Sequence, residues 1–401
     1  MRVQVSRQAG VAPGTMRVVG TITARDRERV VWYEFPEDLE PEIANSAEPW
    51  ALLMLPLASR TGEAIELDQP LDPFFLENFR GLTATWAHWY ADLQEVAVRA
   101  PTQPAPRAHG KTAQFFSGGL DSWFTLLRHS ESTARFPQIG NVDDVITIQG
   151  FGNIPIAERE ENARLAQSVR ETSEHYGKRS LPIATNMRVP VDEAWKLAWL
   201  RWGPQTHGAA LAAAALFLGR RYSTVKIAST HRFWESFPYG SHPMTDTLFS
   251  TSATTFFHDH ALYGRPDKIE RIAESEYAVA RLRVCNAIKA ARNCSQCIKC
   301  HRMLLCFDSL GLLDKAKSFD IDVYRRNKDR PFLIWNDNDH VRALEVRDLA
   351  LSRNRRDIAD VIDTSLRRSR RIRRSTQPLK KVSWRAFTAL YGRMAGDMLG
   401  A

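Results

Sequence analysis

Residues 111–230 alternate between short apolar runs and longer amphipathic stretches. The apolar runs predict four buried strands, at residues 113–116, 144–149, 180–185 and 224–229. Between them, apolar residues recur at the three- and four-residue spacing of helices, at residues 122–129, 158–175, 195–202 and 207–218. Strands that alternate with helices of about ten residues indicate a parallel sheet with helices on both faces. We therefore expect an α/β fold for this part of the chain.

The first hundred residues follow a different pattern. Residues 16–22 and 29–35 alternate between apolar and polar positions like two paired strands, and residues 51–57 form another apolar run. Residues 73–90 are rich in aromatic side chains and have the spacing of a helix. These patterns predict an N-terminal α+β domain over residues 1–98.

Three prolines between residues 99 and 110 interrupt the chain without any apolar periodicity, so we expect a linker there. The remaining parts are expected in chain order: the parallel-sheet α/β domain, a small helical module around a group of cysteines, and a polar helical tail. They cover residues 111–267, 268–315 and 316–401.

The positive charge of the chain is local. Its 401 residues contain 55 Lys and Arg against 46 Asp and Glu, a formal net charge of +9. Eight positive charges lie within residues 366–381, which contain no acid, so the rest of the chain carries about +1. They are Arg367, Arg368, Arg370, Arg371, Arg373, Arg374, Lys380 and Lys381. This stretch predicts contact with a nucleic acid or an acidic partner protein. The alternative is a solvated helix or tail.

Membrane and secretion signals are not found in the sequence. The most apolar helical run, residues 209–218, has about half of the roughly 20 residues that a membrane span needs. The first residues alternate like a strand and lack the apolar core of a signal peptide. Four of the five cysteines are closely spaced, which fits a reduced compartment and a metal better than a disulfide framework. We expect a cytoplasmic protein with no membrane partner.

A phosphate-binding loop is indicated where the first strand of the α/β domain ends. Residues 117–122 read Ser-Gly-Gly-Leu-Asp-Ser and lie between that strand and a helix. Glycines let backbone N–H groups approach an anion, and the N-terminus of a helix favours negative charge. Ser117 and Ser122 add hydroxyl donors. The sequence matches neither a Walker A loop nor the Gly-x-Gly-x-x-Gly of dinucleotide folds. The alternative is a plain strand–helix turn with an aspartate cap.

This loop resembles that of the PP-loop ATP pyrophosphatases, which carry Ser-Gly-Gly-x-Asp-Ser after their first strand. Members of that family transfer AMP to a substrate oxygen and release pyrophosphate, which the loop holds. The resemblance implies a fold like that of the adenine nucleotide alpha hydrolases and an ATP site at Ser117, Gly118, Gly119, Leu120, Asp121 and Ser122. Ser117, Asp121 and Ser122 are then the catalytic candidates, with Asp121 positioning pyrophosphate or Mg²⁺.

Four cysteines follow the pattern C-x8-C-x2-C-x2-C: Cys285, Cys294, Cys297 and Cys300. Four thiolates can close a tetrahedral zinc site, and the short spacings let one turn supply three of them. Such a closed site has no open position, so its role is structural. A redox dithiol and an iron–sulfur cluster are the alternatives. Cys306 remains, and we expect it in the core.

The loop and the cysteines together resemble the 7-cyano-7-deazaguanine synthases of queuosine biosynthesis, over residues 112–305. That family uses ATP and ammonia to convert a deazaguanine carboxylate into an amide and then a nitrile. Two segments depart from its pattern. Residues 204–207 replace a Pro-x-Arg-Asn stretch, and residues 239–246 replace Tyr-Pro-Asp-Cys-Arg. Both would face the substrate, so the resemblance supports the activation chemistry better than it supports the deazaguanine substrate.

Further candidates lie at or beyond the carboxyl ends of the predicted strands, the edge at which parallel sheets bind ligands. Gln149 and Ser229 end two strands and are expected to contact the nucleotide. Four residues are expected to face the substrate: His207, His231, His242 and Asp246. The alternative for the histidines is that they are ordinary loop residues. Residues 258–260 read His-Asp-His, but adjacent residues rarely converge on one metal ion.

The expected activity is an ATP-dependent ligation. A substrate carboxylate attacks the α-phosphorus of ATP, pyrophosphate leaves into the loop, and ammonia or another amine then attacks the acyl-adenylate. ATP, Mg²⁺ and Zn²⁺ are the expected cofactors, a small-molecule or protein-borne carboxylate is the substrate, and the assembly is a homodimer. One alternative is a PP-loop tRNA-modifying enzyme, for thiolation or amidation, with residues 366–381 gripping the RNA. The other is a non-catalytic nucleotide-binding scaffold.

Overall fold

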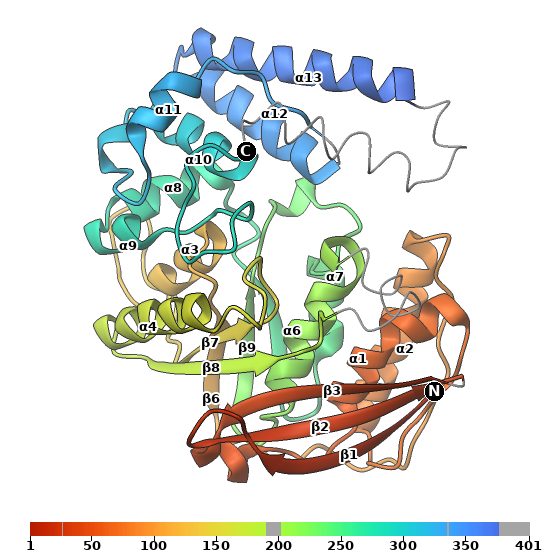
Figure 1. The fold of residues 1–401 in the computed structure, drawn as a ribbon. Helices are drawn as coiled ribbons and strands as arrows, with labels where there is room; N and C mark the ends of the chain where they lie inside the picture. Colours follow the sequence, from red (N-terminus) through yellow and green to blue (C-terminus); the bar gives the residue numbers. More distant parts are fainter. Residues whose placement is uncertain (26, 190–201, 335–336, 377–401) are drawn as a thin grey trace. The chain divides into compact units, whose positions relative to one another are not determined.

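The computed structural model describes residues 1–25, 27–189, 202–334 and 337–376. The chain divides into two compact units, Met1–Tyr263 and Gly264–Ala401. The first unit contains both strands and helices, and the second is built from helices and loops (Figure 1). No helix among the described residues is both long and apolar enough to span a bilayer.

Ten strands of the described residues form one sheet in the first unit. In spatial order they are β10 (Thr255–Asp259), β9 (Tyr222–Ala228), β6 (Lys111–Phe115), β7 (Asp144–Gln149), β8 (Arg179–Thr185), β3 (Arg27–Pro36), β2 (Thr15–Ala24), β1 (Arg2–Ala9), β4 (Ile65–Glu66) and β5 (Val98–Arg99). Neighbours from β10 to β8 are parallel, whereas β8, β3, β2 and β1 pair antiparallel. The unit therefore has an α/β fold around a mostly parallel sheet.

The parallel half has the strand order of a doubly wound fold. The chain enters at β6, moves outward through β7 and β8, and returns to the other side of β6 for β9 and β10. Helices α3 (Leu120–Arg128), α4 (Arg159–His175) and α6 (His207–Leu216) follow β6, β7 and β8 along the chain. The order reverses between β6 and β9, which is the topological switch point where such sheets bind ligands.

The N-terminal strands extend this same sheet. Strands β2 and β3 pair along their whole length, and their alternating sequence buries one face. Strand β3 joins β8 through Tyr33 and Glu34, and the Thr185 hydroxyl donates to the carbonyl of Trp32 (2.7 Å). Residues 1–98, expected as a domain of their own, thus share a sheet and a compact unit with residues 111–263.

The apolar run at residues 51–57 lies inside α1 (Glu48–Thr61), a helix buried on nearly every side. Pro49 suits its first turn, where an N–H would have no helical partner, and Gly62 ends it with φ of 72°. Trp50 packs on Phe217 just after α6, with ring centroids 5.1 Å apart. A helix buried all round is apolar all round, so its sequence lacks the one-sided period that separates helix from strand.

One carboxylate ties three segments of the first unit together. Asp72 caps α2 (Pro73–Trp89) by accepting from the N–H of Phe75 (3.1 Å). It also accepts from the N–H and the hydroxyl of Ser252 (2.7 and 2.8 Å) and from the N–H of Ala105 (3.2 Å). The stretch at 99–110, expected as a linker, is therefore anchored to α2 and to the loop before β10.

The second unit contains α8 (Arg265–Ala273), α9 (Glu276–Arg281), α10 (Ile298–Ser309), α11 (Ile321–Asn327), α12 (Asp337–Ser352) and α13 (Arg356–Thr376). The polar helix α13 still packs, because a narrow stripe of it is buried: Ile358, Val361, Ile362, Ser365 and Ser369. The two serine hydroxyls accept backbone N–H groups from Phe332 (3.0 Å) and Ile334 (2.8 Å). These bonds fix the chain before α12 against α13.

Candidate functional site

The loop at residues 117–122 is held in shape by its own two serines. The hydroxyl of Ser122 donates to the carbonyl of Gly119 (3.0 Å) and accepts from the N–H of Ser117 (3.3 Å). The hydroxyl of Ser117 accepts from the N–H of Gly119 (3.3 Å). The loop is therefore held by its own hydrogen bonds, which lowers the entropic cost of binding a ligand.

Backbone geometry opens this loop to an anion. Gly118 has φ of 74°, a conformation that costs other residues about 1–2 kcal/mol. Gly119 is the N-cap of α3 and offers no side chain to cap it, so the first-turn N–H groups have no partner within the helix. Those N–H groups and the positive end of the helix dipole favour negative charge. Leu120 is buried, so it can offer a ligand only its backbone, whereas Ser117 is exposed and Asp121 half-buried.

The loop lies at the carboxyl end of β6, beside the switch point. Gln149 and Ser229 lie at the carboxyl ends of β7 and β9, the two neighbours of β6 in the sheet. Ser229 is buried and donates its N–H to the carbonyl of Asp259 (2.9 Å), and Gln149 is half-buried. The structure thus places both expected nucleotide contacts on the same edge as the loop, one on each side of it.

The two segments that depart from the synthase pattern lie against one another. The N–H of Gly240 donates to the carbonyl of Gly203 (3.1 Å), and the rings of His207 and Tyr239 have centroids 5.1 Å apart. A β-carbon on Gly208 would lie 1.8 Å from the carbonyl oxygen of Gly240, so this approach requires glycine. The segments expected to face the substrate therefore form one continuous surface.

Asp246 is the centre of the contacts on this surface. Its fully buried carboxylate accepts hydrogen bonds from the hydroxyl of Ser241 (2.7 Å), the N–H of His242 (3.0 Å) and Nδ1 of His258 (2.7 Å). Burial lowers the pKa of His207, and burial together with the nearby imidazole of His258 lowers the pKa of His242. Both rings therefore favour their neutral form at neutral pH.

A small cavity adjoins these residues. It offers about 10 Å³ to the centre of a water-sized molecule, which is room for about one water. Hydroxyl and imidazole side chains are prominent in its wall: Thr230, Ser236, Ser241, His231, His242 and His258. His231 also packs on Phe237, with ring centroids 5.0 Å apart. All four residues expected to face the substrate thus lie in one neighbourhood, and His258 joins them.

The N-terminal helices contribute to this neighbourhood, which the sequence did not indicate. The ring of Trp89 contacts that of His242, with centroids 4.9 Å apart, and the hydroxyl of Tyr90 donates to the carbonyl of Pro204 (2.6 Å). Arg60, near the end of α1, donates to the side chain of Gln205 (2.9 Å). The aromatic richness of residues 73–90 was the only sequence signal, and it does not distinguish a site from a core.

Residues 258–260 divide between two groups, because the side chains of His258 and Asp259 point to opposite faces of β10, whereas His260 lies just past the strand with φ of 63° and contacts Asp259. His258 contacts Asp246, whereas Asp259 lies 3.2 Å from Nε2 of His129 and 2.9 Å from Nε2 of His260. Burial alone would raise the pKa of Asp259, but the hydrogen bonds from both histidines outweigh it and hold that pKa far below its ordinary range. Nζ of Lys226 lies 3.8 Å from Oδ1 of Asp259, and its positive charge disfavours the binding of a divalent cation. The group is a buried ionic network.

We expect Asp259→Asn to destabilise the first unit by roughly 3–5 kcal/mol, because His129 and Lys226 lose their charged acceptor. The folded-state pKa of Asp259 is depressed, so its contribution is present at neutral pH and is lost as the pH falls below the ordinary carboxyl pKa. The free energies of unfolding of variant and wild type, measured with denaturant, should therefore become equal in acid.

Asp38→Asn is the matched control for this change. Asp38 pairs with Arg179 at an exposed position, where an ion pair contributes about 1 kcal/mol or less. Equal destabilisation by the two variants at neutral pH would contradict the role assigned to Asp259.

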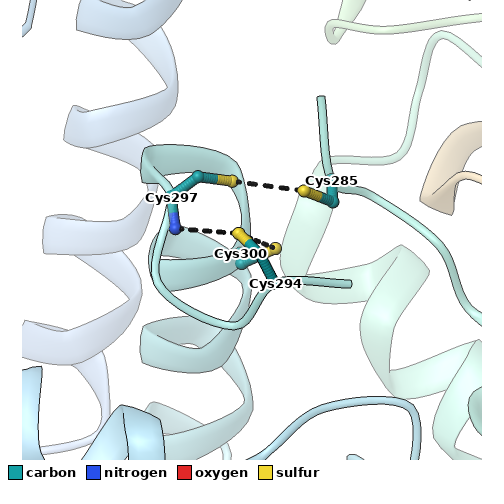
Figure 2. Close-up of side chains that lie close together, drawn as sticks. All are labelled: Cys285, Cys294, Cys297 and Cys300. Atoms are coloured by element: carbon teal, nitrogen blue, oxygen red, sulfur yellow. Dashed lines mark hydrogen bonds between the residues drawn. The ribbon is translucent and has the colours of Figure 1, made fainter. Parts of the chain in front are cut away.

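The four expected cysteines come together in the second unit. Figure 2 shows Cys297 beside Cys285 and Cys294 beside Cys300. The sulfur atoms of the first pair lie 3.8 Å apart and those of the second pair 4.0 Å apart. All four sulfurs lie within 4.8 Å of one another. A tetrahedron of zinc–sulfur bonds of about 2.3 Å sets sulfurs roughly 3.8 Å apart, so the group can hold a zinc ion.

Local structure explains how these cysteines meet. Cys297 is the N-cap of α10 and Cys300 lies in its first turn, while Ser295 with φ of 62° turns the chain between Cys294 and Cys297. The side chain of Asn293 accepts the N–H groups of Val284 and Cys285 (2.9 and 3.2 Å), which brings the distant cysteine alongside.

The basic stretch at 366–381 is described only in part. Arg367, Arg368, Arg370 and Arg371 are exposed on α13, away from its buried stripe. The side chains of Arg373 and Arg374 and the whole of Lys380 and Lys381 lie outside the described residues. An anionic partner for this stretch stays a prediction.

Known proteins offer no match with which this geometry can be compared. No family model matches the chain, and no curated protein or solved structure matches it either.

Proposed function

We propose that this chain is an ATP-dependent ligase that adenylates a carboxylate and releases pyrophosphate. The observation that carries the proposal is the position of the Ser-Gly-Gly-Leu-Asp-Ser loop. It follows the central strand of a doubly wound sheet at its switch point and leads into the N-terminus of α3. The loop has no Walker lysine for a γ-phosphate, and its resemblance to the PP-loop ATP pyrophosphatases points to cleavage between the α- and β-phosphates.

In this proposal the loop holds pyrophosphate as the leaving group. The first-turn N–H groups of α3 and the hydroxyl of Ser117 supply the hydrogen bonds, while Ser122, whose hydroxyl donates to the carbonyl of Gly119, keeps the loop in shape. Donors fixed in advance stabilise developing charge without reorganising during the reaction. Asp121, half-buried in the first turn of α3, would help to hold Mg²⁺, which neutralises phosphate charge when bound. Gln149 and Ser229 would contact the nucleotide from either side.

The surface around Asp246 is the proposed acceptor site. It lies at the carboxyl ends of β9 and β10, the same edge of the sheet as the loop. The substrate-facing residues of the synthase family are replaced there by other polar and aromatic side chains, including His207, Tyr239 and His242. We therefore propose a synthase-like enzyme with a carboxylate acceptor of its own, and with ammonia or another amine as the nitrogen donor. The four-cysteine group would hold a structural zinc.

The test supplies the full chain with ATP, Mg²⁺, ammonium and a panel of carboxylates that begins with a deazaguanine carboxylate. We expect AMP and pyrophosphate in equal amounts, released only when the right carboxylate is present. Chromatography of the nucleotides and an assay for pyrophosphate measure this. ADP and phosphate as the only products would contradict the proposal, and pyrophosphate release that requires tRNA would favour the RNA-modifying alternative.

A further inference from the structure

Asp246 and His258 form a carboxylate–imidazole pair at the carboxyl end of β10. Asp246 ends the short helix α7 (Pro243–Asp246) and is fully buried, and its Oδ2 lies 2.7 Å from Nδ1 of His258. Ser241 and the N–H of His242 donate to the same carboxylate, which fixes its orientation. The imidazole of His258 is therefore held in one position by a carboxylate that two further donors hold.

This contact assigns the tautomer of His258. A carboxylate only accepts hydrogen bonds, so Nδ1 carries the proton and the neutral ring presents Nε2 as an acceptor. Within the described part of the chain Nε2 has no hydrogen-bond partner, and His258 lines the small cavity. The ring thus has the arrangement of a base: one nitrogen fixed to a carboxylate and the other available.

The neighbouring histidines are held differently. Nδ1 of His207 contacts the carbonyl of Gly203 (2.7 Å), and Nδ1 of His242 accepts the N–H of Met244 (3.1 Å). A carboxylate stabilises an imidazolium far better than a backbone carbonyl does. Of the rings around Asp246, His258 is therefore the best placed to take up a proton.

We propose that His258 is the general base that deprotonates the nitrogen nucleophile, with Asp246 as its positioning residue. The inference rests on the proposed function and assigns its second half-reaction. Amines have pKa values of roughly 10, so at neutral pH most of them are protonated and cannot attack a carbonyl carbon. A cavity with room for about one water fits a small ammonium ion better than a bulky amine.

His258 lies on the same edge of the sheet as the loop at residues 117–122, at a distance that one substrate can span. Strand β10 is two strands from β6, so their carboxyl ends lie about 10 Å apart along one edge of the sheet. That span is comparable to the length of a nucleotide. An acyl-adenylate formed at the switch point can therefore extend from the loop to the cavity.

The proposed step is balanced in protons and bonds. Nε2 of His258 takes one proton from ammonium, and the freed lone pair forms the carbon–nitrogen bond to the acyl carbon. The bond from that carbon to the AMP oxygen breaks, with its electrons on AMP, and the second proton lost by nitrogen leaves with AMP or water. The imidazolium of His258 then faces the negative charge of Asp246. His207 and His242, the other titratable rings facing Asp246, stay neutral because burial lowers their pKa.

The experiment compares His258→Gln and Asp246→Asn with His109→Gln in the full chain. His109 is an exposed histidine that pairs with Glu42, so it serves as the control. The acceptor is the carboxylate on which the wild-type chain releases pyrophosphate. Two nucleophiles are supplied: ammonium, which must lose a proton, and hydroxylamine, which is largely unprotonated at neutral pH.

We expect His258→Gln to lower amide formation from ammonium by about 100-fold or more. Hydroxamate formation and pyrophosphate–ATP exchange should stay within a few-fold of the control. Asp246→Asn should also lower the ammonium reaction, because the imidazolium that forms on His258 loses its counter-charge, and it should leave hydroxamate formation close to the control.

An ammonium reaction in His258→Gln that matches the control, with an unchanged pH profile, would overturn the inference. Parallel loss of amide, hydroxamate and exchange would also overturn it, since that pattern indicates a structural role. A wild-type chain without any pyrophosphate exchange contradicts the proposed function itself, and this result is seen before any variant is compared.

Discussion

Removal of zinc from the full chain should unfold the second unit, Gly264–Ala401, and leave Met1–Tyr263 folded. A structural zinc site contributes roughly 10–16 kcal/mol to folding, which is as large as the whole stability of a typical domain. The cysteines join the segment after α9 to the start of α10, so α10 loses its anchor without the metal. Far-ultraviolet circular dichroism should show loss of helix on chelation and its return when zinc is added back.

Two cysteines associated with the same helix provide the matched test. Cys297 belongs to the four-sulfur group, whereas Cys306 is buried later in α10 and outside that group. Elemental analysis should find about one zinc per chain in wild type and in Cys306→Ala, and little in Cys297→Ala. Equal zinc content in the two variants, or unfolding curves unaffected by a chelator, would show that the four sulfurs do not hold the ion.

Gly118→Ala should reduce carboxylate-dependent pyrophosphate release by about 100-fold or more. The loop needs φ of 74° at this residue, and alanine there costs about 1–2 kcal/mol. Relaxation of that strain shifts the N–H groups that follow, and loss of one well-placed donor to a developing anion costs about two to three orders of magnitude in rate. Pyrophosphate–ATP exchange and calorimetric binding of ATP measure the two consequences separately.

Gly177→Ala is the control for backbone strain. Gly177 has φ of 63° in the turn between α4 and β8, and a β-carbon there would meet open space. Its substitution should lower thermal stability about as much as that of Gly118 does, with activity unchanged. If both variants keep full exchange activity, the loop is not the phosphate site, and the scaffold alternative gains support.

The features that the sequence predicted well are local ones. The loop at 117–122 and the short cysteine spacings depend on neighbours in the chain, so reading residues in order is enough to place them on a strand end or a helix start. The strands of the parallel half were expected within two residues of β7, β8 and β9, because buried strands are continuous apolar runs.

The features that the sequence did not predict depend on contacts between segments that are distant in the chain. Arg60 and Tyr90 reach residues 204–205 only because the N-terminal strands and helices join the parallel sheet, and no pattern within residues 1–98 encodes that partner. His258 was considered only with Asp259 and His260. Strand alternation from residue 255 would have separated His258 from Asp259, but β10 itself was not predicted.

The pairing of β3 with β8 also matters while the chain is being made. The bond from Thr185 to Trp32 links residues 153 positions apart, so β3 leaves the ribosome roughly 8–30 s before its partner at ordinary translation rates. During that interval its open edge could pair with another nascent chain. Strand β3 begins with three charged residues, Arg27, Glu28 and Arg29, and charges at a strand edge disfavour pairing with another chain. In the folded protein Arg29 is buried and donates hydrogen bonds to the carbonyls of Met187 and Val189. The same residue that disfavours pairing of the exposed strand edge during synthesis therefore later fixes the chain beyond β8.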